Sequence, residues 1–461
     1  MKGFSAVVPL AVALSATAVS AVAIPDSMIP HYFKRATSLP QVTTKGNAFF
    51  AGNNRFYLRG VDYQPGGSSD AVDPIADKAT CTRDIAEFQK LKINTVRVYT
   101  IDNSANHDDC MNALAAAGIY LALDVNTPKY SINQDSPANS YNAVYLQSIF
   151  ATIDAFQGYS NTLLFFSGNE DINSVATTAA APYVKAVTRD MKTYIGNRKY
   201  RSIPVGYSAA DIDDNRVETA HYMNCGTDDE RSDFFAFNDY SWCDPSTYQT
   251  STWAQKVQAF SNYSIPIFLS EYGCVVTTRK FQEVATLYGS QMTPVYSGGL
   301  VYEYSKEGTS APQDKYGLVS ISGNSVSELT DFDSLQTAFK GTPLPTDDGG
   351  YLQNGSPSIC PTKSSTWLVS GDALPAMPPQ ASQYFKNGAG KGPGLSGSGS
   401  QDAGPGSTGT ASAGSGQPTA TGKGSSTAKS VAGGRPADFS FGPLVCGLVV
   451  LVSSFLGATL L

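Results

Sequence analysis

The chain contains a regular series of short apolar runs that are rich in β-branched and aromatic residues. Several are almost continuously hydrophobic, such as LALDV, LLFFSGNE and IPIFLSEYG, which is typical of parallel strands buried on both faces. The pattern predicts eight strands, at Phe56–Tyr63, Asn94–Thr100, Ile119–Asn126, Thr162–Asn169, Ile203–Ser208, Phe234–Ser241, Ile265–Glu271 and Gly299–Ser305.

Helical patterns separate many of these runs. Apolar residues recur at helical spacing in Cys81–Leu91 and Ala180–Tyr194, and Cys110–Ala117 is rich in alanine. Strands that alternate with helices over about 250 residues favour an α/β fold of the (β/α)8, or TIM barrel, type. A doubly wound open sheet is the alternative, but it usually has fewer strands and a Gly-rich first turn, which this sequence lacks. We place the catalytic barrel in residues 24–345 and a C-terminal extension in residues 346–387.

The two ends of the chain have the pattern of processing signals. Residues 1–23 combine a basic start, an apolar stretch and a small-x-small cleavage site, which favours a signal peptide over an N-terminal membrane anchor. Residues 435–461 end in an apolar tail, which favours a GPI-anchor signal, removed on attachment, over a tail-anchored transmembrane helix. The Gly/Ser-rich residues 388–434 predict a flexible stalk. The expected location is therefore the extracellular face of the plasma membrane, held by a GPI lipid, or the cell wall.

Composition and charge exclude several classes of function. The net charge is −7, with 32 basic residues and no basic cluster, so nucleic acid is not an expected partner. The three histidines, His31, His107 and His221, share no metal-ligand spacing, and no Gly-rich phosphate-binding motif follows a predicted strand. Neither a metal nor another cofactor is expected.

The cysteines and two sequons fit an exported protein. Cys446 lies in the predicted anchor signal, and the remaining cysteines are even in number, which indicates disulfides whose pairing the spacing alone leaves open. The sequons predict N-glycosylation at Asn262 and Asn354. The cysteines that remain are Cys81, Cys110, Cys225, Cys243, Cys274 and Cys360.

Carboxylates, amides and aromatic residues gather where the predicted strands end, and in a (β/α)8 barrel that end carries the chemistry. Glu170 closes the fourth run and Glu271 the seventh. An ionisable residue directly after a buried run is costly unless it is paired or used. A structural ion pair is the alternative for either glutamate alone, but two such residues favour function. Retaining glycoside hydrolysis needs two carboxyls about 5–5.5 Å apart, one protonated and one ionised.

Two neighbours fit this chemistry. Asn169 precedes the first glutamate, and an amide there is able to hydrogen-bond a sugar 2-hydroxyl in the transition state. Tyr240 is well placed to hold the ionised carboxylate, although a core tyrosine remains the alternative.

The ordered strings GVDYQPGG (60–67), NTVRVYTID (94–102), LALDVNTP (121–128), SGNEDIN (167–173), FNDYSWC (237–243), SEYGC (270–274) and SGGLVYEYS (297–305) resemble fungal β-1,3-glucanosyltransferases of glycoside hydrolase family 72. The resemblance spans about residues 38–345 and implies that Glu170 is the acid/base and Glu271 the nucleophile. It also implies the disulfides Cys81–Cys110, Cys225–Cys360 and Cys243–Cys274, the second tying the extension to the barrel. The residues that the resemblance places along the bound substrate are Tyr63, Gln64, Tyr99, Asp124, Asn169, Tyr240 and Tyr302.

Two features depart from the family's pattern. Asp171 stands where an apolar residue is more usual, and it either raises the pKa of the neighbouring glutamate or points away. The chain also lacks the Cys-rich carbohydrate-binding module of many members, so it resembles the module-free subgroup. The leading interpretation is a monomeric transglycosylase that cuts β-1,3-glucan donor chains and rejoins them to acceptor chains. An endo-β-1,3-glucanase and a non-catalytic glucan-binding wall protein are the alternatives.

Overall fold

The structure, a computed structural model, describes residues 38–308, 312–407 and 409–411. The predicted signal peptide, the predicted GPI-anchor signal and the part of the predicted stalk from residue 412 onward lie outside the described residues. Within the described ranges, no helix is both long and apolar enough to cross a membrane.

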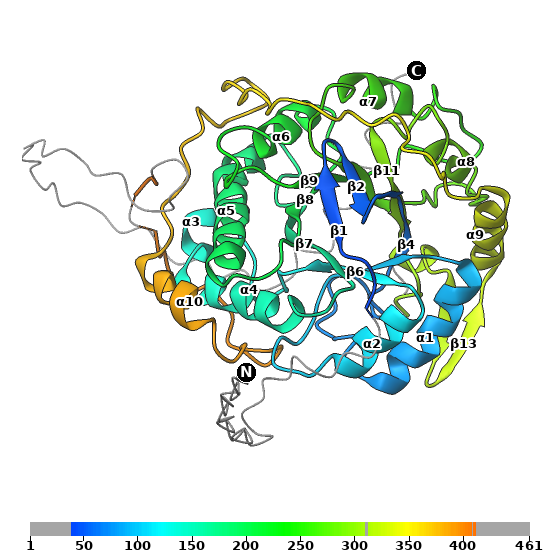
Figure 1. Ribbon diagram of the computed structural model, residues 1–461, viewed down its shortest axis with the longest axis horizontal. Helices are drawn as coiled ribbons and strands as arrows, with labels where there is room; N and C mark the ends of the chain where they lie inside the picture. The colour runs from blue at the N-terminus through cyan, green and yellow to red at the C-terminus, as the bar shows by residue number, and fades with distance from the viewer. Residues whose placement is uncertain (1–37, 309–311, 408, 412–461) are drawn as a thin grey trace, which may run out of the picture. The chain divides into compact units, whose positions relative to one another are not determined.

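Eight parallel strands close into a barrel, which confirms the predicted (β/α)8 fold (Figure 1). In spatial order the barrel runs β10-β11-β4-β5-β6-β7-β8-β9. Each predicted run overlaps one barrel strand, although the last strand begins three residues earlier than predicted, at Tyr296 rather than Gly299. The strands are β4 Leu58–Asp62, β5 Thr95–Val98, β6 Tyr120–Asp124, β7 Thr162–Asn169, β8 Val205–Ala210, β9 Phe234–Asn238, β10 Ile267–Tyr272 and β11 Tyr296–Val301.

Helices surround the barrel (Figure 1). The first begins where the Asp77 carboxylate accepts a hydrogen bond from the backbone N–H of Thr80, and it ends at Lys92 in the left-handed conformation. The helices are α1 Lys78–Leu91, α2 Asp108–Ala116, α3 Pro137–Ser140, α4 Ala143–Phe156, α5 Ala181–Asn197, α6 Arg216–Met223, α7 Trp253–Ala259, α8 Glu283–Leu287, α9 Thr330–Gly341 and α10 Ser382–Asn387, with 3-10 turns η3 Ala176–Ala180, η4 Pro312–Lys315 and η5 Pro379–Ala381.

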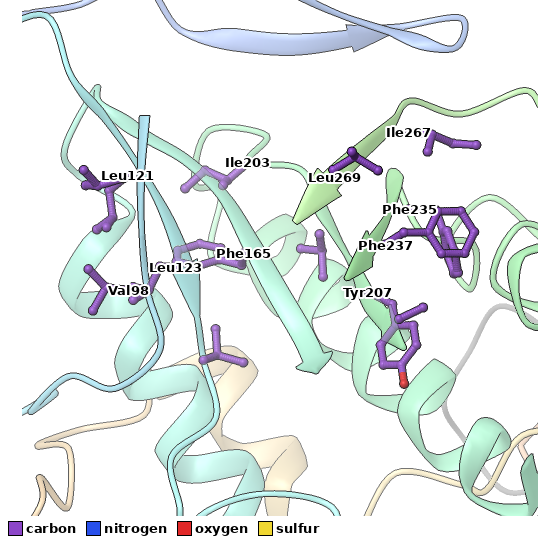
Figure 2. Close-up of a cluster of buried hydrophobic side chains, with 14 of the residues drawn as sticks. Val98, Leu121, Leu123, Phe165, Ile203, Tyr207, Phe235, Phe237, Ile267 and Leu269 are labelled. Carbon is purple, nitrogen blue, oxygen red and sulfur yellow. The ribbon is translucent and has the colours of Figure 1, made fainter. Parts of the chain in front are cut away.

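Alternation along the barrel strands separates two apolar layers. Side chains such as Phe166, Phe234 and Phe268 fill the inside of the barrel, and Phe49 packs against the last two. Phe49 belongs to a small antiparallel sheet that the sequence pattern did not predict, made of β1 Val42–Lys45, β2 Ala48–Ala51 and β3 Asn54–Phe56. A second unpredicted pair, β12 Val319–Ser322 with β13 Ser325–Glu328, follows the barrel. The other layer lies between strands and helices, and Figure 2 shows part of it, including Val98, Leu121, Leu123, Phe165, Tyr207, Phe235 and Leu269.

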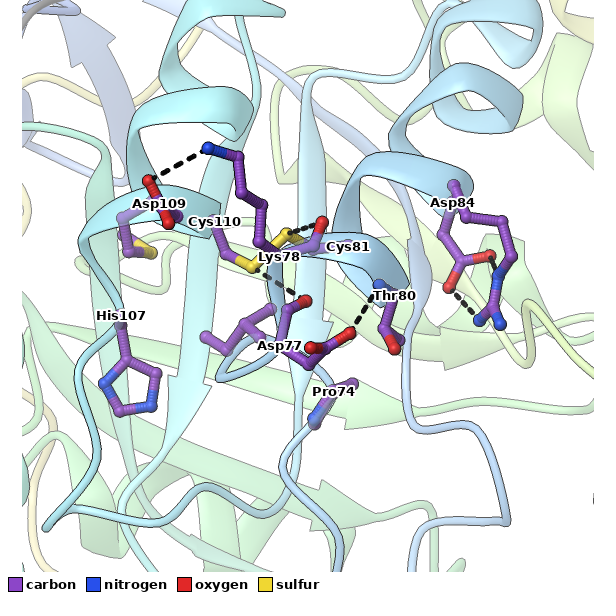
Figure 3. Close-up of a disulfide and its surroundings, with 12 residues drawn as sticks. Pro74, Asp77, Lys78, Thr80, Cys81, Asp84, His107, Asp109 and Cys110 are labelled. Atoms are coloured by element: carbon purple, nitrogen blue, oxygen red, sulfur yellow. Dashed lines mark hydrogen bonds and ion pairs between the residues drawn. A yellow bond between two sulfur atoms is a disulfide. The ribbon is translucent and has the colours of Figure 1, made fainter. Parts of the chain in front are cut away.

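Three disulfides join segments that are distant in the sequence, and they pair as the family resemblance implies. Cys81–Cys110 joins the starts of α1 and α2 (Figure 3). Cys243–Cys274 joins the segments that follow β9 and β10. Cys225–Cys360 ties the C-terminal extension to the segment after α6, as predicted.

Residues 388–407 differ from the predicted flexible stalk. Ala389 and Ser400 are buried, and the segment makes hydrogen bonds to α4 and to the loops after β5 and β6. The prediction is therefore wrong for this first part of the range. Glycine content indicated flexibility, but glycine also permits close approach of two backbones, and sequence composition does not separate the two uses.

Candidate active site

Polar side chains from six strands meet inside the C-terminal end of the barrel. They are Asp62 of β4, Arg97 of β5, Asp124 of β6, Asn169 of β7, Asn238 of β9 and Glu271 of β10. On β4, β5, β6 and β9 the alternation of inward and outward residues brings the side chain into the barrel, and on β7 and β10 a register irregularity near the end of the strand precedes it. This convergence forms the candidate active site.

Arg97 is the centre of this cluster and is fully buried. Its guanidinium donates to both oxygens of Asp124, at 2.8 and 3.1 Å, and to Oδ1 of Asn169 at 2.9 Å. It also donates to Oε1 of Glu271 at 3.2 Å, and its flat face lies over the ring of Phe166. A buried charge of this kind persists only when it is paired and hydrogen-bonded. The guanidinium therefore fixes three side chains of the candidate site relative to one another.

Glu271 accepts hydrogen bonds on both carboxylate oxygens. The hydroxyl of Tyr99 donates to Oε1 and that of Tyr240 donates to Oε2, each at 2.7 Å, while Arg97 adds a third donor. The side chain is 10% exposed, so part of it remains accessible. The arrangement offers an oriented carboxylate oxygen to a ligand in the barrel mouth.

Glu170 lies in a different environment. Its backbone has a φ of 53°, in the left-handed region, and its N–H donates to the carbonyl of Ser208 at 2.9 Å. Gln134 donates to the Glu170 carbonyl at 3.2 Å, and Asn238 donates to its carboxyl Oε1 at 2.9 Å. Burial, and then the negative charge of Glu271, raise the pKa of Glu170 from 4.5 to about 7. A protonated carboxyl is therefore available on Glu170 near neutral pH.

The amide of Asn169 has a fixed orientation. Its Oδ1 accepts from Arg97, from the hydroxyl of Ser208 at 2.8 Å and from Nδ2 of Asn238 at 3.1 Å. Since the oxygen takes all three donors, the amide nitrogen must point the other way. Among the residues that the structure describes, this nitrogen donates to none, which leaves it available to a ligand hydroxyl.

Aromatic rings line one side of the two glutamates. The ring of Tyr302 contacts Tyr99 and Tyr240 edge-on at centroid distances of 6.4 Å, and Tyr316 at 5.3 Å. Tyr240 and Tyr316 are 5.6 Å apart. Rigid aromatic surfaces next to polar groups are suited to sugar rings, which present apolar faces and polar edges.

Comparison with known proteins identifies the family. The glucanosyltransferase family model, glycoside hydrolase family 72, matches residues 32–343. This chain belongs to that family. It is 62% identical over 386 residues to 1,3-beta-glucanosyltransferase gel1 of Aspergillus fumigatus, covering 84% of each chain. It is 53% identical over 359 residues to 1,3-beta-glucanosyltransferase GAS5 of Saccharomyces cerevisiae, covering 77% of this chain and 73% of that protein.

A solved structure of a family 72 relative has the same barrel. A Glu-to-Gln mutant of Saccharomyces cerevisiae Gas2p, in complex with laminaritetraose and laminaripentaose, superposes with a TM-score of 0.67 at 36% identity. The match covers 74% of this chain and 76% of that chain. In the described part of this chain, all six cysteines are in the disulfides given above, so no Cys-rich module follows the barrel there.

Three residues that the family resemblance placed along the substrate lie differently. Tyr63 is 1% exposed and points outward to the helix layer, where its hydroxyl donates to Asp84 at 2.7 Å, so the expected substrate contact is wrong. One strand position decides this, because Asp62 has the inward parity and Tyr63 the outward one. Gln64 accepts on Oε1 from the backbone N–H of Tyr99 and donates to a carbonyl of its own loop. Its amide holds the backbone at Tyr99, and the carboxylate of Asp124 holds Arg97, so both side chains support the residues of the site.

Sequence reasoning missed several residues of the site. Asn238, which bridges Glu170 and Asn169, is the uncharged last residue of the apolar strand β9, and Tyr316 comes from a loop beyond the barrel. Asp62 is 1% exposed, and within the described ranges neither of its carboxylate oxygens has a hydrogen-bond partner. Burial raises the pKa of Asp62 well above its usual range. The sequence signal for Asp62 is its position on β4, four residues after Leu58, because alternate residues of that strand face the barrel interior.

Asp171 is buried behind the site. Its carboxyl fills the space that Gly168 leaves, since a Cβ there would lie 2.3 Å from Oδ2. Burial raises the pKa of Asp171 to about 8. The elevated pKa of Glu170 follows from burial and from Glu271, so it needs no contribution from its neighbour. In the described parts of the chain, no group of three His, Cys, Asp or Glu side chains is arranged to hold a metal ion.

Proposed function

We propose that this protein is a retaining β-1,3-glucanosyltransferase. It cleaves an internal linkage of a β-1,3-glucan and transfers the new reducing end to the non-reducing end of a second glucan chain. The single observation that carries the proposal is the contrast between two carboxyls at one barrel mouth. Glu271 accepts hydrogen bonds from three donors, and the pKa of Glu170 is raised to about 7.

In the first half-reaction, Glu271 attacks the anomeric carbon of the donor glucan, and the glycosidic bond breaks. Glu170 gives its proton to the departing oxygen, so the leaving chain departs as an alcohol and a glucosyl-enzyme ester forms. Arg97, Tyr99 and Tyr240 hold the nucleophile in position before the attack. Since these donors are already oriented, little reorganisation is needed as the reaction proceeds.

In the second half-reaction, Glu170, now ionised, removes the proton from the 3-hydroxyl of an acceptor chain. The acceptor oxygen attacks the anomeric carbon, the ester breaks, and Glu271 returns to its carboxylate form. Atoms balance, because one β-1,3 linkage is broken and one is made. A pKa near neutrality suits a group that must act as acid and then as base.

Binding of the glucan is assigned to the surrounding polar and aromatic groups. The unpaired amide nitrogen of Asn169 donates to the 2-hydroxyl of the reacting sugar. The rings of Tyr240, Tyr302 and Tyr316 supply stacking surfaces that retain an acceptor long enough to exclude water. The complex of the relative Gas2p with laminari-oligosaccharides supports this substrate class.

We further propose that the protein is exported, carries a GPI lipid and acts at the outer face of the plasma membrane or in the cell wall. The N-terminal and C-terminal patterns of the sequence support this location. Both predicted glycosylation sites, Asn262 and Asn354, are exposed, which fits an accessible sequon.

Product analysis on a reduced β-1,3-gluco-oligosaccharide tests the proposal. The purified protein is compared with its Glu170→Gln and Glu271→Gln variants by mass spectrometry of the product lengths. Products longer than the substrate, absent with both variants, are expected. If only shorter products form while reducing ends increase in step, the protein is an endo-β-1,3-glucanase instead. If no substrate is consumed, the non-catalytic wall protein is the better account.

A further inference from the structure

The Gly-rich segment after α10, residues 388–407, is here called the strap. It begins at α4 and α5, where the backbone N–H of Ala389 donates to the carboxylate of Asp154 and Gln147 donates to the Ala389 carbonyl. It then passes the loop after β5, where the N–H of Gly394 donates to Asn103 at 2.9 Å. The strap is therefore bonded along its length to the catalytic barrel.

Two glycines of the strap lie where an added Cβ would clash with the barrel. A Cβ on Gly397 would be 2.1 Å from the hydroxyl oxygen of Tyr130, and one on Gly392 would be 2.2 Å from Oδ1 of Asn103. Contacts below 3 Å require something to move. These glycines thus allow close approach of the strap to the barrel, and they hold it there rather than loosening it.

The middle of the strap lies against the β6 loop, residues 125–136 between β6 and α3. Lys129 donates to the strap carbonyls of Leu395 and Gly397, at 3.0 and 3.2 Å. The backbone N–H of Ser400, which is fully buried, donates to the Lys129 carbonyl at 2.9 Å. Further contacts join Gly399 to Tyr130 and Gln401 to Ser131. Three consecutive residues of the β6 loop are therefore held by the strap.

The same loop reaches the active site a few residues further on. Gln134 donates from Nε2 to the backbone carbonyl of Glu170 at 3.2 Å. Glu170 has a φ of 53°, a conformation that a residue with a side chain keeps only when its surroundings impose it. The N–H of Glu170, which belongs to the preceding peptide group, donates to the carbonyl of Ser208. Gln134 is thus one of two anchors of the turn that aims the Glu170 carboxyl.

We propose that the strap is a positioning element of the active site: by fixing the β6 loop, it lets Gln134 hold the Glu170 turn in its productive conformation. The inference rests on the proposed acid/base role of Glu170. It assigns a part in catalysis to a segment whose composition suggests a spacer. Misplacement of a reacting group by about 1 Å lowers rates by about 100-fold, so a modest shift of this loop is enough to be measured.

Gly397→Val in the full chain is the direct test, with Ser396→Val as the matched control, because Ser396 is exposed and its side chain makes no hydrogen bond within the described structure. Lys129→Met, which removes two strap hydrogen bonds from an exposed side chain, is a milder second variant. We expect Gly397→Val to lower kcat by about 10-fold or more, with a smaller change in KM, and Lys129→Met to act in the same direction. Ser396→Val should match the parent.

Two readouts separate positioning from simple loss of stability. Loosening the turn admits water to Glu170, so the alkaline limb of the kcat/KM profile should move to lower pH, which a general loss of folded protein does not produce. Gly397→Val and Gln134→Ala should also be non-additive, because both act through one hydrogen bond.

An unchanged kcat and an unchanged alkaline limb in Gly397→Val and Lys129→Met overturn the inference, as do strictly additive effects with Gln134→Ala. Failure of the proposed function gives a different result, because the parent protein itself would then make no products that are longer than the substrate.

Discussion

Replacing Glu170 by glutamine should abolish transfer and make the protein more stable, by an amount that grows with pH. In the folded protein, burial and the charge of Glu271 oppose ionisation of Glu170. In the unfolded chain, the same carboxyl ionises freely. Glutamine keeps the shape and the oxygen that accepts from Asn238, but it carries no charge to bury. The expected gain is therefore electrostatic.

The size of the gain follows from the pKa of Glu170, which rises from 4.5 to about 7 on folding. At 1.36 kcal/mol for each pKa unit, ionised Glu170 destabilises the fold by about 3 kcal/mol. The sign follows from proton binding. Between pH 4.5 and 7 the folded state binds more protons at this site than the unfolded state, so its contribution to stability falls as pH rises. Below pH 4.5 the parent and the Glu170→Gln variant should have equal free energies of unfolding. Above pH 7 the variant should have the higher free energy of unfolding.

Urea unfolding at pH 4, 6 and 8, with disulfides intact and tryptophan fluorescence as the probe, measures this difference. Glu271→Gln is the control, because it is also inactive but places an amide N–H2 against the donors of Tyr99, Tyr240 and Arg97. It should be less stable than the parent at all three pH values. A Glu170→Gln advantage that does not change with pH, or a parent that is the more stable protein at pH 8, would refute the assigned environment.

Three further outcomes are expected. The alkaline limb of kcat/KM for transfer should lie near pH 7, where Glu170 loses its proton, and a limb above pH 9 contradicts this assignment. Arg97→Met leaves Asp124 buried without its counter-ion and should cost about 3–5 kcal/mol in urea unfolding, while addition of Asp124→Asn should recover stability but not transfer. Tyr63→Phe should lower stability by about 1–2 kcal/mol through Asp84 and leave KM for glucan unchanged, whereas a raised KM would return Tyr63 to the substrate site.

The barrel was predictable because its strands obey a simple rule. Strands buried on both faces appear as continuous apolar runs, and closure of the barrel brings their ends together, so Glu170 and Glu271 stood out as candidates from their positions at strand ends. The small sheet that packs Phe49 against the barrel was not predicted, because its strands are only three or four residues long.

The missed site residues share a different cause. At the end of β4 a shift of one residue exchanges the barrel interior for the helix layer, and the resemblance alone did not distinguish Asp62 from Tyr63. Asn238 and Tyr316 are brought to the site by tertiary structure, from a strand and a loop that carry no charge signal. The glycines of the strap were misinterpreted as a sign of flexibility. A high glycine content shows that the unfolded chain has many accessible conformations, but packing decides whether the segment is flexible in the folded protein.

In the proposed mechanism, Glu271 forms a covalent bond to the donor sugar while Glu170 supplies the proton. Incubation with a 2-deoxy-2-fluoro β-1,3-linked disaccharide fluoride, followed by proteolysis and mass spectrometry, tests it most directly, because the fluorine slows breakdown of the glycosyl-enzyme. We expect one added fluoro-glycosyl group, on the peptide that contains Glu271, and none in Glu271→Gln. A label on Glu170 or Asp62, or no label in a protein that still consumes glucan, would contradict it.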